Sequence, residues 1–379
     1  MHRPGEPGST RSRTLKCVSV LVFALLVAGC ACLGGCDQKS PTAAGGTKSA
    51  SQSAGPTGTA ASGAASNSGV AAPPVSGAVK RVAVVPKGTT HEYWKSIHAG
   101  ARKAERELGG IQITFRGPAK EDDREQQIAL MENLISSRYD AIVLAPLDDR
   151  ALVGPVRSAR DAKIPVVIMD SGLEAKAGED YASFVATDNE KGGRLAGERL
   201  GELLKGRGKV VLLRYQEGSA STALREKGFV DALAGFKDIQ LIDPKRFAGP
   251  TRDTAQQAAE NLLSNHADLA GVFCPNESST FGMMLALRSR GLAGKVAFLG
   301  FDSSAELVDA MRKGEISGLV VQNPIRMGYL AVKAAADVLA GRPVEPRIDT
   351  GVQLITKENM DTPESKEILS PDLKSLLGS

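Results

Sequence analysis

The chain has 379 residues, of which 42% are hydrophobic and 24% charged, the composition of a globular protein with room for two domain cores. The formal net charge is +4, and Arg3, Arg11, Arg13 and Lys16, set against Glu6, account for three of these four charges. The rest of the chain is therefore close to neutral, and it lacks the basic footprint of a nucleic-acid-binding protein.

The amino terminus has the pattern of an export signal. A basic region ends at Lys16, and the apolar stretch that follows, residues 17–29, is too short to span a bilayer comfortably. Small residues precede Cys30 and again Cys36, as in a bacterial lipobox, whose cysteine receives lipid. We expect residues 1–36 to be a lipoprotein signal that includes the lipidated cysteine, with Cys36 and Cys30 both open as the modified residue. The alternative is an ordinary secretory signal with incidental cysteines.

Residues 37–79 consist mostly of Ser, Ala, Gly, Thr and Pro, without an aromatic residue. Such a segment cannot bury a core, so we predict a flexible tether that spans about 35–40 Å as a coil. Beyond it the only cysteine is Cys274, which excludes an internal disulfide framework in the folded part. Cys274 lies in an apolar run, which predicts that it is buried and packs as a small hydrophobic residue.

From residue 80 onward, short apolar runs alternate with helical segments, which predicts βαβ units built around parallel sheets. About ten runs are too many for one comfortable sheet, so we infer an α/β fold with two sheets in two lobes. The predicted strands are Val82–Val85, Ile111–Phe115, Ala141–Ala145, Pro165–Met169, Phe184–Ala186, Val210–Leu213, Ile239–Ile242, Ala270–Phe273, Val296–Leu299 and Leu319–Val321. The clearest predicted helices are Arg124–Ser137, Lys191–Leu204, Arg252–Ser264 and Ser279–Gly291.

The first strand leads into a polar loop and then a helix that opens with Tyr93 and Trp94, the only tryptophan. Ligands of open α/β sheets bind beyond the carboxyl ends of the strands. An aromatic pair more often caps a core, but this position favours a platform for a ligand.

Polar side chains follow most of the predicted strands. Asp or Asn after a strand is usually a helix cap, so one such residue is a weak signal, whereas seven in one chain are harder to dismiss. Two carboxylates, an arginine, an asparagine and a glutamine around an aromatic pair suit a polyol, whose hydroxyls both donate and accept. The seven strand ends lead to Lys87, Asp148-Asp149, Asp170-Ser171, Glu217 and then Arg225, Asn276-Glu277, Asp302-Ser303 and Gln322-Asn323.

The chain resembles the periplasmic sugar-binding proteins of the ribose-binding type over residues 80–354. The segments that carry the resemblance are 164–171 (IPVVIMDS), 186–193 (ATDNEKGG), 221–229 (STALREKGF), 274–277 (CPNE), 299–302 (LGFD) and 321–324 (VQNP). The resemblance implies the type I periplasmic binding protein fold, in which two Rossmann-like lobes with parallel sheets are joined by three crossovers. It also implies that the protein serves an ABC importer.

The resemblance also implies where a sugar binds. The family's ligand-contacting positions fall on Tyr93, Trp94, Asp170, Arg225, Asn276, Asp302 and Gln322. Three further candidate positions, Lys87, His91 and Ser171, depart from the family's residue types, and no aromatic stands near residues 250–251, where the family has one. A sugar other than ribose, a phosphorylated or acidic polyol, and a signalling molecule all stay open as ligands. Lys87 is either a ligand contact or a solvated loop charge.

Domain boundaries follow from the same resemblance. We expect an amino-terminal lobe of residues 80–187 and 324–348 and a carboxyl-terminal lobe of residues 188–323 and 349–379. The chain would cross between the lobes near residues 187–189, 322–324 and 349–351, and these crossings would form the hinge of a closing motion.

Other functions find little support in the sequence. There is no GxSxG, GxxxxGK or HExxH motif, and no histidine set at metal-ligand spacing, so we expect no enzyme, cofactor or metal. A repressor of this fold would carry a helix-turn-helix where this chain has a signal and tether. We expect a monomer outside the cytoplasm, held to the membrane only by lipid, with a permease and its ATPase as partners. A membrane receptor or sensor kinase is the alternative partner.

Overall fold

The computed structural model describes residues 78–378 except 243, 244 and 246. The predicted export signal, Cys30, Cys36 and the tether up to residue 77 lie outside the described residues. Within the described ranges, no helix is both long and apolar enough to cross a membrane.

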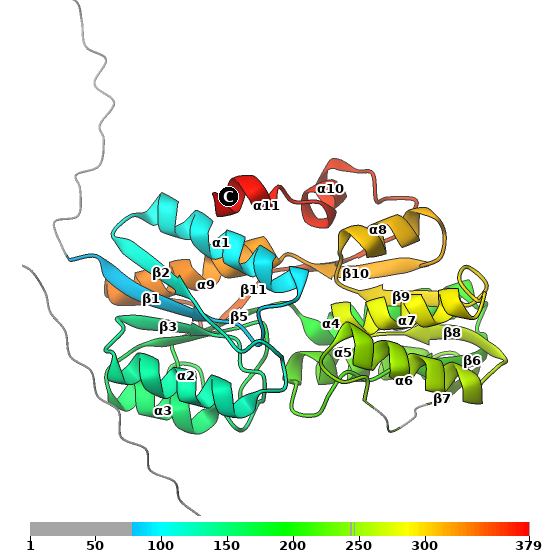
Figure 1. The fold of residues 1–379 in the computed structure, drawn as a ribbon, viewed down its shortest axis with the longest axis horizontal. Coiled ribbons are helices and arrows are strands. Elements are labelled where there is room, and N and C mark those ends of the chain that lie inside the picture. Colours follow the sequence, from blue (N-terminus) through cyan, green and yellow to red (C-terminus); the bar gives the residue numbers. More distant parts are fainter. Residues whose placement is uncertain (1–77, 243–244, 246, 379) are drawn as a thin grey trace, which may run out of the picture. The chain divides into compact units, whose positions relative to one another are not determined.

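The first lobe is built on a six-stranded parallel sheet with the strand order β11-β5-β4-β3-β1-β2. Helices α1 and α9 cover one face of this sheet, and α2 and α3 cover the other (Figure 1). Its strands are β1 (Lys80–Val85), β2 (Ile111–Phe115), β3 (Ala141–Leu144), β4 (Val166–Met169), β5 (Ser183–Ala186) and β11 (Arg347–Asp349). Its helices are α1 (Glu92–Leu108), α2 (Arg124–Ser136), α3 (Val153–Asp161) and α9 (Pro324–Leu339).

The second lobe repeats this plan with the strand order β12-β10-β9-β8-β6-β7, in which β12 alone is antiparallel. Helices α4 and α5 cover one face, and α6, α7 and α8 cover the other. Its strands are β6 (Arg207–Leu212), β7 (Asp238–Ile242), β8 (Leu269–Phe273), β9 (Ala297–Phe301), β10 (Gly318–Gln322) and β12 (Val352–Ile355). Its helices are α4 (Asn189–Leu203), α5 (Ala220–Leu233), α6 (Arg252–Asn265), α7 (Glu277–Ser289) and α8 (Ala305–Arg312), and the chain ends with α10 (Pro363–Leu369) and α11 (Leu373–Leu377).

The predicted α/β fold with two Rossmann-like lobes is confirmed. Each of the ten predicted strands overlaps an observed one. The strands β11 and β12 were not predicted, because neither forms a continuous apolar run: the three residues of β11 are Arg-Ile-Asp, and β12 is only partly buried along most of its length.

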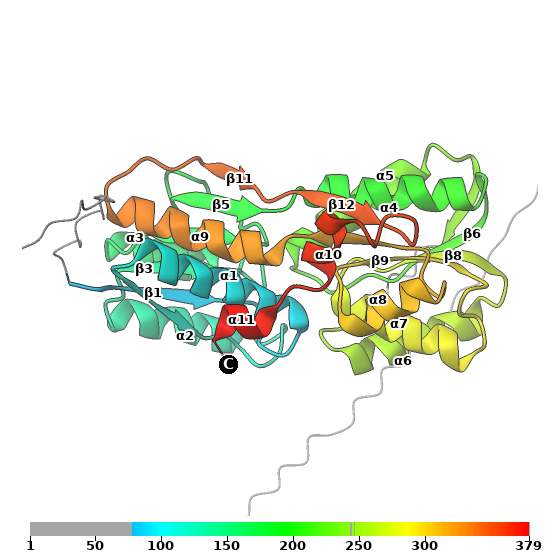
Figure 2. The same cartoon turned by 90° about the horizontal axis from the view of Figure 1, so that it is seen from above.

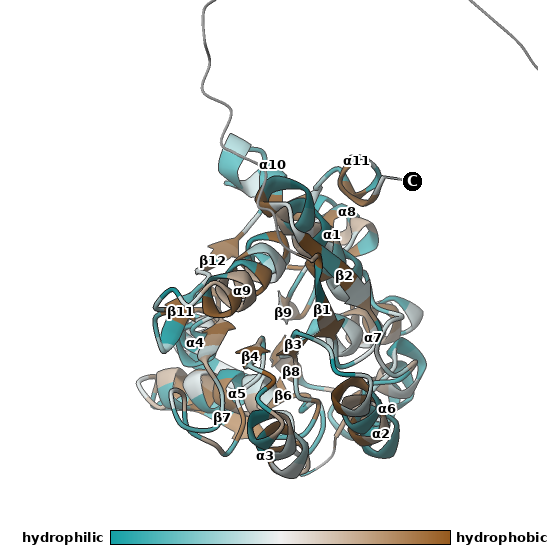
Figure 3. Cartoon of the chain, turned by 90° about the vertical axis from the view of Figure 1, so that its left-hand side faces the viewer, coloured by the Kyte–Doolittle hydropathy of each residue, from teal (hydrophilic) through white to brown (hydrophobic). Residues whose placement is uncertain are grey.

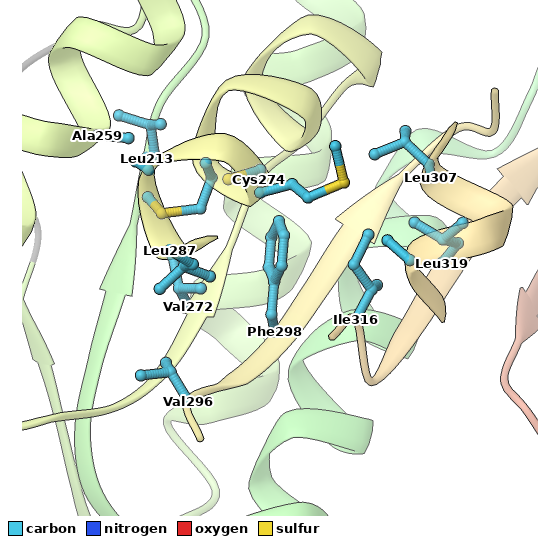
Figure 4. Packing of buried hydrophobic residues seen from close by; sticks show 14 of the residues in the cluster. Leu213, Ala259, Val272, Cys274, Leu287, Val296, Phe298, Leu307, Ile316 and Leu319 are labelled. Carbon is cyan, nitrogen blue, oxygen red and sulfur yellow. The ribbon is translucent and has the colours of Figure 1, made fainter. Parts of the chain in front are cut away.

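Apolar side chains pack on both faces of each sheet, as expected for strands covered by helices on two sides. Figure 3 shows apolar residues on the strands that lie between the helix layers. Figure 4 shows one such cluster, with Phe298 of β9 at its centre between Val272 and Leu287 on one side and Ile316 on the other. Cys274 belongs to this cluster and is fully buried, as the sequence predicts.

Three crossings connect the lobes and lie against one another. The chain passes from β5 to α4, from β10 to α9, and from β11 to β12. The Thr187 hydroxyl of the first crossing donates to Oε1 of Gln322 at 2.9 Å and lies 3.3 Å from the hydroxyl of Thr350 at the third. These hydrogen bonds connect the three crossings at the centre of the hinge.

The last helix, α11, belongs to the segment predicted for the second lobe and contacts α1 of the first (Figure 2). Arg106 of α1 donates to the carbonyl oxygen of Leu376 at 2.8 Å. The carboxyl-terminal segment thus forms an additional connection from the second sheet to the first lobe.

Helices α1 and α9 approach each other closely at two glycines. A Cβ atom on Gly100 would lie 2.0 Å from the carbonyl oxygen of Ile325, and one on Gly328 would lie 2.2 Å from that of Ile97. Contacts this short against backbone leave no room for a side chain, so these glycines set the position of α1 and hence of Tyr93 and Trp94.

We predict that Gly328→Ala destabilises the protein by about 1–3 kcal/mol, because the methyl group must push α1 away from α9. Chemical denaturation measures this change. The control is Gly154→Ala on the exposed face of α3, where an added Cβ meets nothing within 4 Å and helix propensity favours alanine. Equal stability of the two variants would contradict the close packing.

Candidate functional site

A cavity of about 30 Å³ lies between the lobes and is lined by side chains of both. The loops that carry these residues meet between the two sheets, at the carboxyl ends of the strands (Figure 1). The lining contains every predicted site residue except Ser171. Its members are Lys87, His91, Tyr93, Trp94, Glu121, Asp170, Tyr215, Ser221, Thr222, Arg225, Asn276, Glu277, Asp302 and Gln322.

Asp170 and Asp302 occupy equivalent positions in the two lobes, directly after β4 and β9. Both have left-handed backbone, with φ of 64° and 68°, a conformation that aspartate adopts more readily than most residues but that is still costly. The Asp170 carboxylate accepts from the Tyr93 hydroxyl at 2.7 Å, and the Asp302 carboxylate accepts from Nε2 of Gln322 at 2.7 Å. The turn after each strand thus directs a carboxylate into the space between the lobes.

Lys87 is buried, with 3% of its surface exposed, so the alternative of a solvated loop charge is wrong. Its ammonium group lies 3.4 Å from Oδ2 of Asp170 in the same lobe. It also donates to the hydroxyls of Ser219 and Ser221 in the other lobe, at 3.2 and 3.1 Å. These three oxygens replace the water that a buried ammonium group loses.

Glu121, which no sequence pattern indicated, receives three hydrogen bonds. Its carboxylate contacts Nδ1 of His91 at 2.6 Å, accepts from Nε1 of Trp94 at 2.7 Å and accepts from the hydroxyl of Tyr215 at 2.8 Å. Burial acts against the imidazolium, but the Glu121 carboxylate outweighs it and raises the pKa of His91 to about 9. Burial likewise opposes the carboxylate, but the His91 charge lowers the pKa of Glu121 to about 2. The two form an ion pair at neutral pH.

Tyr93 and Trp94 pack in a hydrophobic core and also line the cavity. Both are buried and pack in the hydrophobic cluster of α1 and α9, in an edge-to-face pair with ring centroids 5.0 Å apart. Both also line the cavity. Their hydrogen bonds to Asp170 and Glu121 hold the two rings in place, while their contact with a ligand stays a prediction.

Arg225 is held from several sides. Its Nε donates to Oδ1 of Asn189 at 2.8 Å, its Nη1 donates to the carbonyl of Pro275 at 2.9 Å, and Nη1 lies 3.9 Å from Oδ2 of Asp302. The guanidinium group lies over the ring of Phe301, 3.8 Å from its centroid. Burial raises the pKa of Asp302 to about 6, while the Arg225 charge acts in the opposite direction.

The remaining predicted residues have mixed outcomes. Asn276 lines the cavity and also caps α7 by accepting from the backbone N–H of Ser279. Ser171 does not line the cavity. Its hydroxyl accepts from the backbone N–H of Ser221 at 3.1 Å, and it thereby joins the two lobes. Contact of Asn276 or Ser171 with a ligand stays a prediction.

Sequence reasoning missed the lining residues Glu121, Tyr215, Ser221, Thr222 and Glu277. Three of them carried a signal: Ser221 and Thr222 open the segment that also holds Arg225, and Glu277 directly follows Asn276 at a predicted strand end. Glu121 and Tyr215 stand in loops outside any motif. Among the described residues, no group of His, Cys, Asp and Glu could hold a metal ion.

Comparison with known proteins identifies relatives. The chain is 29% identical to the D-ribose/D-allose-binding protein of Pseudomonas aeruginosa over 286 residues, which are 73% of this chain and 88% of the relative. It is 31% identical to a ribose import binding protein of Bacillus subtilis over 238 residues, 63% of this chain and 75% of that one.

A solved structure is also similar: an ABC transporter solute binding protein from Agrobacterium vitis with bound D-fucose. It is 36% identical with a TM-score of 0.74, and the match covers 76% of this chain and 99% of that one. These relatives are binding proteins and not enzymes, and the same holds for this chain. The family model of the periplasmic binding protein domain matches residues 82–343, and the chain belongs to that family.

Proposed function

We propose that this protein captures a neutral monosaccharide or a related polyol between its two lobes and delivers it to an ABC importer. The observation that carries the proposal is the cavity in which Asp170 of one lobe faces Arg225 and Asp302 of the other. D-Fucose bound to the similar Agrobacterium protein and the ribose and allose named for other relatives support a sugar as the ligand.

The donors and acceptors of the cavity suit hydroxyl groups. Carboxylates at Asp170 and Asp302 accept, the Arg225 guanidinium donates, and the side-chain amides can do either. A ligand that contacts both lobes stabilises their closed arrangement, because only such a ligand distinguishes it from an open one.

The charges of the site favour a neutral sugar over an acidic or phosphorylated one. The donors of Lys87 are engaged by Asp170, Ser219 and Ser221, and the charge of His91 is balanced by Glu121. No cation of the lining is left without a nearby carboxylate, so an anionic ligand would bring an unbalanced charge into a buried site.

Delivery to a membrane sensor kinase or receptor is the alternative, and it would use the same site. Operon neighbours distinguish the two, because a permease and an ATPase indicate import and a sensor kinase indicates signalling.

We further propose that the mature protein lies outside the cytoplasm, tethered through lipid on Cys36 or Cys30. The basis is the lipobox-like sequence before each cysteine and the tether composition after them. We expect mass spectrometry of the mature amino terminus to find a diacylated cysteine at one of these positions. An unmodified mature terminus at any other residue would contradict the anchor.

The binding proposal is tested first by a thermal-shift screen of D-fucose, D-ribose, D-allose, D-arabinose, glucuronate and ribose 5-phosphate. A ligand that binds only the folded state raises its stability, so we expect at least one neutral sugar to raise the melting temperature and both anions to have no effect. A screen in which only the anions stabilise the protein would contradict the charge argument.

With a stabilising sugar in hand, we expect Asp170→Ala and Arg225→Ala each to weaken its binding by about 2–5 kcal/mol, measured by calorimetry, because a charged partner is lost from a desolvated site. The control is Asp180→Ala, which removes a buried carboxylate of the first lobe that pairs with Arg157 and Arg160 away from the cavity. Wild-type affinity in both site variants would refute the assignment.

The His91–Glu121 pair predicts a pH dependence of stability. The folded state raises the pKa of His91 from 6.5 to about 9. The contribution of His91 to the free energy of unfolding is therefore complete below pH 6.5 and is lost as pH rises through 9. We expect the unfolding free energy of wild type to fall over this range and that of His91→Gln to fall less. His98→Gln is the control, since burial lowers the pKa of His98 below 6.5. Parallel curves for wild type and His91→Gln above pH 6.5 would show that the pair is not charged.

A further inference from the structure

Two buried polar atoms that belong to residues of the cavity lining have no hydrogen-bond partner among the described residues. They are Oε2 of Glu277 and Nη2 of Arg225. Folded proteins seldom leave buried donors or acceptors unpaired, and an unpaired one at a binding site points to a group that binds there.

Glu277 is the first residue of α7 and is 1% exposed. Its other carboxylate oxygen, Oε1, pairs with Arg252, whose guanidinium group lies over the ring of Phe281 at 3.8 Å. The backbone N–H of Glu277 donates to Oδ2 of Asp302 at 3.2 Å. Glu277 is therefore held through its backbone N–H and through Oε1, and only Oε2 is free to accept a further hydrogen bond.

Arg225, on α5, lies near the same Asp302 carboxylate. Its Nη1 lies 3.9 Å from Oδ2 of Asp302, the atom that also accepts from the Glu277 backbone. The free donor of Arg225 and the free acceptor of Glu277 thus belong to residues that meet at one carboxylate oxygen. A hydroxyl can accept from the first and donate to the second, whereas an ammonium group would satisfy Glu277 but be repelled by Arg225.

We propose that Glu277 is a specificity-determining residue that requires one particular hydroxyl of the sugar, which Glu277 binds through Oε2 together with Arg225. This inference rests on the proposed sugar-binding function and deepens it, because it assigns one hydroxyl of the ligand to a residue that is not among the predicted ligand contacts.

The test is Glu277→Gln, which has the same shape. Arg252 offers only donors, so it holds the amide oxygen and leaves the NH₂ group where Oε2 was. Two donors, from Gln and from Arg225, then meet the sugar hydroxyl. We expect binding of the sugar to weaken about 10- to 100-fold by calorimetry, the usual scale for a hydrogen bond to a charged group.

Binding of deoxy sugars to wild type and to Glu277→Gln forms a double-mutant cycle. It separates the loss of one hydrogen bond to the sugar from a general weakening of the site. The probes are D-galactose and its 2-, 3-, 4- and 6-deoxy analogues, of which the last is D-fucose, or the D-ribose series if the thermal-shift screen favours pentoses. We expect Glu277→Gln to weaken all sugars of the series except one, for which the loss disappears because the hydroxyl in question is missing.

Glu315→Gln is the matched control, since Glu315 pairs with Arg288 in the same lobe and does not line the cavity. It should bind every sugar like wild type. If Glu277→Gln does not fold, Glu277→Asp keeps the charge, withdraws the carboxylate by one methylene, and should show the same single exception. An equal loss for every analogue, or none, would overturn the inference while leaving sugar binding by wild type intact. If wild type binds no sugar, the proposed function fails and the inference fails with it.

Discussion

The burial of charged groups in the cleft, each paired within its own lobe and some also hydrogen-bonded to hydroxyls of the other, is the constraint on which this site depends. A charge taken out of water is tolerated only with an opposite charge and hydrogen bonds around it. The ammonium group of Lys87 donates hydrogen bonds to the hydroxyls of Ser219 and Ser221 in the other lobe. The Glu121 carboxylate accepts a hydrogen bond from the Tyr215 hydroxyl across the same cleft. These charged groups therefore have all their described partners only when the two lobes meet.

The two lobes reach this arrangement by the same local means. In each lobe an aspartate follows the equivalent strand in left-handed backbone, and its N–H donates to the next strand, Asp170 to Val185 at 3.0 Å and Asp302 to Val320 at 2.8 Å. What differs is the partner of each carboxylate: a tyrosine and a lysine in the first lobe, a glutamine and an arginine in the second. The repeated backbone places the carboxylates, and each lobe supplies different side chains as their partners.

Much of the fold and part of the site could be predicted from the sequence. Apolar runs revealed the strands that are buried on both faces, and the polar residues directly after them, such as Asp170 and Asp302, line the cavity. Glu121 escaped prediction because it stands in a loop well past β2, where only the tertiary fold brings it to His91 and Trp94. Glu277 sits beside a helix cap, and an acidic residue there is ordinarily explained by the helix dipole.

Small-angle X-ray scattering of the mature protein, with and without a sugar that calorimetry has shown to bind, tests the central claim most directly. If the ligand joins both lobes, the radius of gyration should fall when the sugar is added, and the scattering of the folded part should approach that of residues 78–378 with the lobes in contact. A radius that does not change, in a sample whose sugar-free form scatters as the larger open particle, would contradict capture between two closing lobes.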